Sequence, residues 1–238
     1  MHILLSEISI FNYPASSLSL VGNHEGGNTL KILILGANGQ IARIVRQRLL
    51  KETDAQLTLY LRQPKRLGQT DSSRETVING DVNDYPTLAQ AMAGQDLVYA
   101  NLGGEFEPMA KNIVQAMTAA HVNRLIYVTG LGLYHEVPGE FGRWVEESIG
   151  TPVMDDTRRA AKIIEESTVN YTIIRAAYMT NDDEIDYELT EKGTPFKGTT
   201  ISRQSIADLI VKTIKNPALH QHSSLGIDKP GTDGDRPY

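Results

Sequence analysis

The chain has 238 residues and a mass of 26.3 kDa, which suits one domain of roughly 150 to 200 residues with a short appendage. It contains no cysteine, which excludes disulfide scaffolds, zinc–thiolate sites, iron–sulfur clusters and thiol nucleophiles. With 23 Lys and Arg against 29 Asp and Glu, a net charge of −6 and 40% hydrophobic residues, the composition argues against a nucleic-acid binder and against wholesale disorder.

The first segment, residues 1–29, is predicted to be a leader that is either disordered or not part of the native protein. It contains no Lys or Arg, and an acidic residue and a proline interrupt its apolar stretches, so it does not fit a secretory signal peptide. Codons for residues 25–28 can spell a ribosome-binding site, and Leu30 can be encoded by the alternative start codon TTG. An ordinary leader strand with a Gly/Asn/Ser linker is the alternative. We expect residues 30–238 to form a single domain.

Short apolar runs alternate with amphipathic stretches along the rest of the chain. The predicted strands cover residues 31–35, 57–61, 75–79, 96–100, 124–128 and 171–174, with a further strand expected late in the chain. The predicted helices cover residues 41–51, 84–92, 108–120, 153–167 and 202–214, the first with Arg43, Arg46 and Gln47 on its exposed face. This alternation predicts an α/β fold, a Rossmann-type doubly wound parallel sheet with a small C-terminal substrate region and an irregular tail from residue 228.

A glycine-rich turn joins the first predicted strand to the first predicted helix. Gly36 would make the tight turn, Gly39 would let the backbone approach a pyrophosphate, and Ala42 would let the helix pack closely on the sheet. The N–H groups at the start of the helix would then face the phosphates. A βα turn that merely requires glycine is the alternative, but the strand–turn–helix context favours a dinucleotide site. The expected cofactor contacts in this turn are Gly36, Ala37, Asn38, Gly39, Gln40 and Ile41.

The end of the second predicted strand indicates which dinucleotide would bind. An NAD site usually places Asp or Glu here, about 20 residues past the loop, to bind the ribose 2′-hydroxyl. This chain has Arg62 twenty residues after Ala42, followed by Lys65 and Arg66, and Arg43 could add a further contact. Cations suit a 2′-phosphate, so NADP(H) is preferred over NAD(H); a solvated basic loop is the alternative.

Ligands of such sheets lie beyond the carboxyl ends of the strands, where several further residues are expected. By this rule Asp81 and Val82 flank the adenine, and Thr129 lies near the nicotinamide. The segment expected along the ribose and phosphates consists of Asn101, Leu102 and Gly103.

Several motifs in this order resemble a known family. GANGQIA, LYLRQPKR, NGDV, VYANLGG, IYVTGLG and YTIIRAAYM are together similar to atypical short-chain dehydrogenases/reductases of the NAD(P)H-binding, NmrA-like type. The resemblance runs from Leu30 to about Lys229 and includes residues 196–214. Bacterial members of this type are often labelled nucleoside-diphosphate-sugar epimerases, and it also includes biliverdin/flavin reductase. The resemblance implies a Rossmann fold, a nicotinamide cofactor and a small-molecule substrate.

The catalytic pattern of that superfamily is only partly present. Its active members carry a Ser or Thr after the fifth strand and a Tyr-x-x-x-Lys motif on the next helix. Thr129 matches the first position, but Met154 stands where the Tyr is expected and Arg158 where the Lys is expected. A thioether transfers no proton, whereas Arg158 could still hold a ribose hydroxyl. Tyr134 and Tyr178 are substitute proton donors only if the fold brings them to the nicotinamide.

These observations predict an NADP(H)-binding oxidoreductase that transfers hydride to a flavin-like or quinone-like acceptor with little proton help. The alternative is a non-catalytic NADP(H) redox sensor that acts through a regulatory protein, and a sugar-nucleotide epimerase ranks third because it needs the missing Tyr. The segment Glu140–Ile149, with Trp144, could cover the nicotinamide, and a core or interface aromatic is the alternative. The acidic run at residues 182–188 is expected to be a solvated loop, and a lid rim over the substrate cleft is the alternative.

The remaining expectations concern location and partners. The chain has no run of about 18 apolar residues and no secretion signal, so we expect a cytoplasmic protein that contacts neither membrane nor nucleic acid. His220 and His222 lack a third ligand, so no metal site is expected. The protein is expected to be a monomer or a homodimer.

Overall fold

A computed structural model of the protein describes residues 29–237, so the predicted leader lies outside the described residues except for its last residue. The centre of the fold is an eight-stranded sheet in which neighbouring strands are parallel, apart from the antiparallel β10–β8 pair. This confirms the predicted Rossmann-type α/β fold. The strands lie in the order β3 (Glu75–Asn79), β2 (Gln56–Leu61), β1 (Lys31–Leu35), β4 (Leu97–Asn101), β5 (Arg124–Gly130), β6 (Asn170–Ala176), β10 (Ser223–Asp228) and β8 (Glu188–Glu191).

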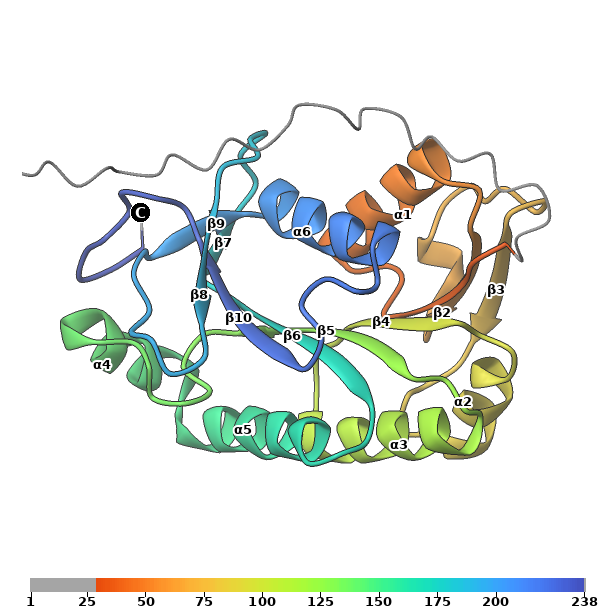
Figure 1. Ribbon diagram of the computed structural model, residues 1–238, viewed down its shortest axis with the longest axis horizontal. Coiled ribbons are helices and arrows are strands. Elements are labelled where there is room, and N and C mark those ends of the chain that lie inside the picture. Colours follow the sequence, from red (N-terminus) through yellow and green to blue (C-terminus); the bar gives the residue numbers. More distant parts are fainter. Residues whose placement is uncertain (1–28, 238) are drawn as a thin grey trace, which may run out of the picture.

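Helices cover both faces of the sheet (Figure 1). One layer, above the sheet in Figure 1, consists of α1 (Gln40–Glu52) and α6 (Arg203–Lys215). The layer below consists of α2 (Tyr85–Met92), α3 (Phe106–Ala119) and α5 (Thr151–Glu165), with α4 (Gly139–Ile149) at its left end. A small second sheet joins β7 (Tyr178–Thr180) to β9 (Thr200–Ser202) in parallel. Within residues 29–237, none of the helices is both long enough and apolar enough to cross a membrane.

Two apolar clusters fill the spaces between the sheet and its helical layers. Along β1, Ile32 and Ile34 belong to the cluster under α1 and α6, whereas Leu33 and Leu35 belong to the cluster under α3 and α5. All four side chains are fully buried. A strand that is buried on both faces is apolar at every position, which is why the sequence shows continuous runs rather than alternation.

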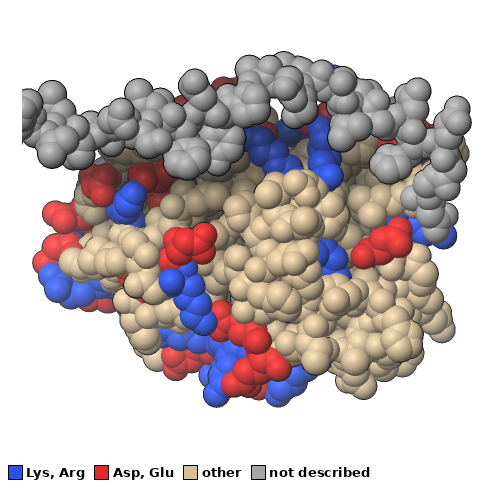
Figure 2. All heavy atoms as spheres, viewed as in Figure 1, with Lys and Arg blue, Asp and Glu red and all other residues tan. Residues whose placement is uncertain are grey.

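Charged side chains lie mainly on the outer surfaces of the helices. On the face shown in Figure 2, Lys and Arg are interspersed with Asp and Glu along the lower layer. On α3, Glu107 pairs with both Lys111 of the same helix and Arg159 of α5. Exposed pairs of this kind contribute little stability individually, so the two apolar clusters hold the layers together.

The predicted elements agree with the observed ones to within a few residues, and the main differences lie in the second half of the chain. The helix expected at 108–120 begins earlier, at Phe106, and the helix expected at 153–167 spans Thr151–Glu165. Ser202 caps α6, because its Oγ accepts the N–H of Ser205 at 3.0 Å. The segment Glu140–Ile149, suggested as a cover for the nicotinamide, belongs to helix α4, and the short strands β7, β8 and β9 had no sequence signal.

A buried carboxylate closes the end of β10. Asp228 is fully buried, and its Oδ2 accepts the N–H of Gly198 at 3.0 Å. Its Oδ1 has no hydrogen-bond partner among the described residues. Burial raises the pKa of Asp228 from its ordinary value of 3.8 to about 6. Burial therefore disfavours the ionised form of Asp228 relative to that of an exposed aspartate.

Replacing Asp228 with Asn is expected to stabilise the protein at pH 8 and to have a much smaller effect at pH 4. Because the folded protein binds this proton more tightly than the unfolded chain does, stability is lost as the pH rises from about 4 through about 6. The full loss is about 3 kcal/mol, since each pKa unit corresponds to about 1.4 kcal/mol. Urea unfolding at both pH values measures it, with the exposed Asp54→Asn as the matched control. An equal effect of Asp228→Asn at the two pH values would contradict this assignment.

Candidate functional site

A cleft of about 820 Å³ runs along the carboxyl ends of β1 to β4. Four segments line it: the turn after β1, the end of β2 with the turn that follows, the residues after β3, and the residues after β4. The cleft therefore brings together most of the residues predicted to contact a dinucleotide. The predicted residues that line it are Gly36, Asn38, Gly39, Gln40, Arg62, Asp81, Val82, Asn101, Leu102 and Gly103.

The turn between β1 and α1 can be built only with glycine at its first position. Gly36 has a φ of +81°, and a Cβ on it would lie 2.2 Å from the carbonyl oxygen of Asn101. The Gly36 N–H donates to the carbonyl of Tyr60 at 3.0 Å, which fixes the turn against β2. Helix α1 then begins at Gln40 without an acidic residue in its first turn and without a side-chain cap on Gly39. Its first N–H groups are thus available to an anion, which fits a pyrophosphate.

The floor of the cleft beyond β2 is set by a buried tyrosine. The hydroxyl of Tyr60 donates to the carbonyl of Asp81 at 2.8 Å, and a Cβ on Gly80 would lie 2.4 Å from the Tyr60 ring. Burial, together with the charges of Asp84 and Asp81, raises the pKa of Tyr60 to about 12, so the phenol stays neutral. Tyr60 was not among the predicted site residues, because no feature of the sequence separates a strand tyrosine that lines a cleft from one in the core.

Two arginines form the wall of the cleft after β2. Arg62 is 71% exposed, and its guanidinium lies 3.8 Å from the Asp81 carboxylate. Arg66 lines the same wall from the 3₁₀ turn Pro64–Arg66, whereas Lys65 of that turn does not line the cleft. Arg43 lies behind them, donating to Asn38 Oδ1 at 2.5 Å and to the Arg66 carbonyl at 2.9 Å. Its guanidinium therefore ties the glycine turn to the arginine-bearing turn.

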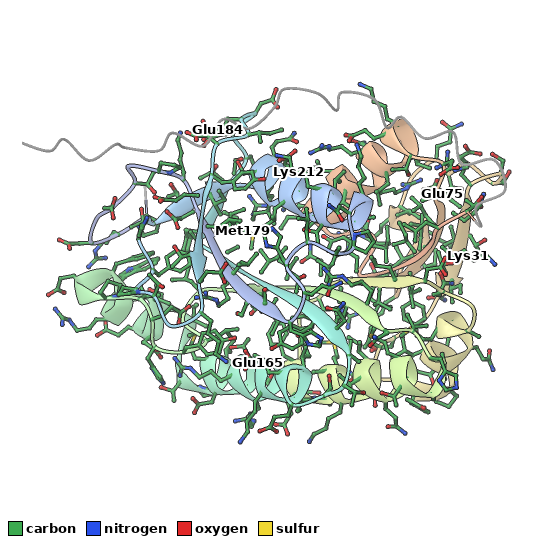
Figure 3. All side chains as sticks on the ribbon, in the orientation of Figure 1. Lys31, Glu75, Glu165, Met179, Glu184 and Lys212 are labelled. Carbon is green, nitrogen blue, oxygen red and sulfur yellow. The ribbon has the colours of Figure 1, made fainter. Side chains whose placement is uncertain are left out.

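The segment that carries these arginines is anchored by a buried ion pair. Arg46 of α1 donates to Glu75 Oε2 at 2.7 Å and to the Gln69 carbonyl at 2.9 Å. Glu75 also accepts the N–H of Asp71 at 2.9 Å, and Figure 3 shows it on β3 at the right of the view. The prediction that Arg46 lies on the exposed face of its helix was wrong, because its partner is 29 residues away and no helical periodicity reveals it.

The carboxyl ends of β5 and β6 form the next part of the same edge of the sheet. The Leu131 N–H donates to the Ala176 carbonyl at 3.1 Å, which holds the two strand ends together. Thr129 is buried in β5, and a Cβ on the neighbouring Gly130 would meet no atom within 4 Å. Tyr178, two residues after Ala176, is 48% exposed. Thr129 and Tyr178 thus lie at one edge, although neither lines the cleft.

The residues at the two positions of the Tyr-x-x-x-Lys pattern, Met154 and Arg158, both make packing contacts. Met154 is buried, and its Cε lies 2.7 Å from the place of a Cβ on Gly132. The guanidinium of Arg158 donates to the Gly132 carbonyl at 2.9 Å and pairs with Glu146 of α4. Arg158 therefore joins α4 and α5 to the turn after β5. A contact between Arg158 and a ribose hydroxyl of the cofactor stays a prediction.

Tyr134 lies in the lower layer rather than at this edge. Its hydroxyl is 2.6 Å from Glu165 Oε1 and 2.8 Å from Ser224 Oγ. Figure 3 shows Glu165 on α5, well below Met179, the neighbour of Tyr178 on β7. Burial, followed by the hydrogen bond to the Glu165 carboxylate, raises the pKa of Tyr134 well above its ordinary value. These contacts engage the hydroxyl in packing, so Tyr178 is the better placed of the two tyrosines.

The turn after β5 is organised around a second buried ion pair. Arg175 of β6 is fully buried and donates to Glu136 Oε1 at 2.7 Å. Glu136 also accepts the N–H groups of Gly132 at 3.0 Å and Tyr134 at 2.9 Å. Burial raises the pKa of Glu136, but the backbone N–H groups of Tyr134 and of Glu136 itself, together with the Arg175 guanidinium, outweigh it and hold that pKa below its ordinary value. The carboxylate is therefore charged and shapes the whole turn.

Known proteins match this chain over nearly all of the described residues. Residues 36–217 match the model of an NAD(P)H-binding family. A Rossmann-fold NAD(P)-binding family protein from Shigella flexneri is 43% identical, with a TM-score of 0.77, 89% of this chain and 99% of that chain covered. A wide-type short-chain dehydrogenase/reductase from Veillonella parvula, solved in complex with NADP, is 33% identical, with a TM-score of 0.83 and coverage of 87% and 98%.

A third match comes from a curated enzyme. The NAD(P)H azoreductase of Xenophilus azovorans is 23% identical over 208 residues, which is 84% of this chain and 68% of that protein. The family model matches most of the chain, and the two solved relatives agree with it. These matches show to which family the chain belongs. The chain belongs to the NAD(P)H-binding family of Rossmann-fold proteins, as the resemblance of its motifs to atypical short-chain dehydrogenases/reductases implies.

Proposed function

We propose that the protein is an NADPH-dependent reductase that delivers hydride to a flavin-like or quinone-like acceptor. The observation that carries the proposal is the cleft itself, with the glycine turn at one end and Arg62 and Arg66 on the wall after β2. No carboxylate follows β2 in the sequence Arg62-Gln63-Pro64, where an NAD site needs one for the ribose 2′-hydroxyl.

Each part of the cleft suits one part of the cofactor. The backbone from Gly36 to Ile41 would bind the pyrophosphate, with Ala37 buried beneath the turn. Arg62 and Arg66 would bind the 2′-phosphate, and the segment Asp81–Val82 would border the adenine. The segment Asn101–Gly103 would follow the ribose and phosphates, and Thr129 would border the nicotinamide, which supplies the hydride when bound. The NADP complex of the 33% identical relative supports this assignment.

The residues at the reaction edge favour an acceptor that needs no protein proton donor. Met154 replaces the usual tyrosine, and the Tyr134 hydroxyl is engaged by Glu165 and Ser224. A quinone accepts hydride without an acid held by the protein: NADPH, a proton from water and the quinone give NADP⁺ and the hydroquinone. The name of the 23% identical relative, an NAD(P)H azoreductase, also favours a reductase of conjugated acceptors.

Turnover with a panel of acceptors tests the proposal. We expect NADPH oxidation, followed at 340 nm, with 2-methyl-1,4-naphthoquinone or riboflavin, and no turnover with an aliphatic aldehyde, whose alkoxide product requires a proton donor. The same assay without protein is the control. If no acceptor raises the rate above that control, the reductase proposal fails.

A non-catalytic sensor is the second candidate, and the packing of Met154 and Arg158 favours it. With both positions engaged in contacts to the turn after β5, cofactor binding could be transmitted through that turn to a regulatory protein. Retention of a protein partner that depends on NADPH, in a protein without turnover, would select this candidate. A sugar-nucleotide epimerase ranks behind both, because it requires the tyrosine that Met154 replaces.

A further inference from the structure

An aromatic pair lies beside the carboxyl ends of β5 and β6. The ring of Trp144, on α4, lies 5.2 Å from that of Tyr178, with the ring planes tilted by 55°. Phe141 lies nearly parallel to Trp144 at 6.1 Å and is buried in the apolar cluster. Trp144 is therefore held from within the fold, while Tyr178 remains half exposed.

The backbone around Tyr178 fixes the position of this pair. The Tyr178 N–H donates to the Thr199 carbonyl at 3.0 Å, and the Ala177 N–H donates to the Ile227 carbonyl at 3.1 Å. Two residues earlier, Ala176 pairs with Gly130, where a Cβ would meet only open space. The cleft occupies the ends of β1 to β4, so the aromatic pair stands next along the same edge of the sheet.

The cations close to the pair in sequence and structure are already engaged. Arg143 pairs with Glu140, and Arg158 pairs with Glu146. Arg203 donates to two carbonyl oxygens of β7, at 3.1 and 3.0 Å, and to the side chain of the next residue. Each of these three arginines therefore already has a carboxylate or carbonyl partner within the protein. This surface suits an uncharged ring.

We propose that Trp144 and Tyr178 form a stacking wall for the uncharged planar ring of the acceptor. The inference rests on the proposed reductase function and adds the residues that select the acceptor. Aromatic faces attract flat conjugated rings in offset or tilted stacks, whereas a saturated chain makes no such contact. Phe141 stacks on Trp144 within the apolar cluster, so the Trp144 ring is held in place before binding and needs little further ordering.

Trp144 provides a direct measurement, because it is the only tryptophan in the chain. The full-length protein, saturated with NADP⁺, is titrated with 2-methyl-1,4-naphthoquinone while tryptophan fluorescence is recorded. We expect saturable quenching with a defined Kd. Free N-acetyltryptophanamide, quenched by collision alone, serves as the reference and gives a linear response.

Variants of Tyr178 keep this reporter in place. Tyr178→Ala is expected to raise the Kd of the naphthoquinone roughly 3- to 10-fold, the range for loss of one aromatic contact. Tyr178→Phe keeps the ring and is expected to retain most of the affinity. Leu219→Ala, which removes an exposed apolar side chain from the turn between α6 and β10, is the control. Riboflavin is expected to bind at least as tightly as its phosphate ester, flavin mononucleotide.

Calorimetric titration with NADP⁺ distinguishes failure of the proposed reductase function from failure of the proposed stacking wall. If NADP⁺ does not bind, the proposed function itself fails. If NADP⁺ binds with equal affinity to the wild type and Tyr178→Ala, three results overturn the stacking wall alone. These are linear quenching, equal naphthoquinone affinity in the wild type and Tyr178→Ala, and tighter binding of flavin mononucleotide than of riboflavin.

Discussion

Replacing Glu136 with Ala is expected to lower the free energy of unfolding by about 3–5 kcal/mol. The substitution leaves the guanidinium of Arg175 fully buried without its carboxylate partner, and removal of one member of a buried pair has this cost. It also removes the acceptor of two N–H groups, those of Gly132 and Tyr134, from the turn after β5. Urea unfolding at pH 7 measures the change.

The exposed pair between Arg143 and Glu140 provides the matched control. Both of its side chains are more than half exposed, so Glu140→Ala should change the stability by less than about 1 kcal/mol. The pKa of Glu136 is held below its ordinary value, so its contribution is present above about pH 4.5 and is lost as the pH falls through the lowered pKa. The difference between wild type and Glu136→Ala should therefore shrink in acid. Equal costs for Glu136→Ala and Glu140→Ala would contradict the buried pair.

Removing the two cleft arginines is expected to weaken NADP⁺ binding roughly 10- to 100-fold and to change NAD⁺ binding by less than about twofold. Arg62 and Arg66 stand on the wall after β2, against which the 2′-phosphate is proposed to lie. This phosphate is the only group that distinguishes the two cofactors. Solvent exposure of Arg62 reduces the benefit of its charge, which is why both residues are changed together. Calorimetric titration of the Arg62→Ala, Arg66→Ala double variant with each cofactor gives the answer.

Lys65→Ala is the control for this experiment, because Lys65 belongs to the same turn but does not line the cleft. It removes a positive charge from the same segment, so any effect of overall charge appears in this variant as well. A similar loss of affinity for NADP⁺ and NAD⁺ in the double variant would show that the two arginines do not bind the 2′-phosphate.

The fold could be predicted from the sequence where burial requires a continuous pattern. The run Lys31–Leu35 buries side chains on both faces of the sheet, and the following Gly36 adopts a conformation that other residues rarely adopt, so strand, turn and helix are all visible locally. Helix α4 was not predicted as a helix, because it buries only a few residues, among them Phe141 and Val145. The three-residue strands β7 and β9 depend on pairing between residues more than 20 positions apart.

The site was predictable to the extent that its groups belong to the backbone or to the ends of strands. The glycine turn and the residues after β2, β3 and β4 reach the cleft because a parallel sheet brings all carboxyl ends to one edge. Side chains with distant partners could not be placed in this way. Arg46, Tyr134 and Arg158 each take their position from a partner on another element, and no local pattern encodes such a pair.

The contact between Met154 and Gly132 has a consequence for how this chain could change over evolutionary time. A single substitution of Met154 by Tyr would put a phenol hydroxyl into the apolar cluster to which Met154 belongs, at a cost of about 1–3 kcal/mol for an unpaired buried hydroxyl. A Cβ on Gly132, in turn, would lie 2.7 Å from the Met154 Cε, so the methionine would have to shift to admit it. The packing of the two positions is therefore coupled. A functional tyrosine at position 154 would need compensating changes in the packing around it.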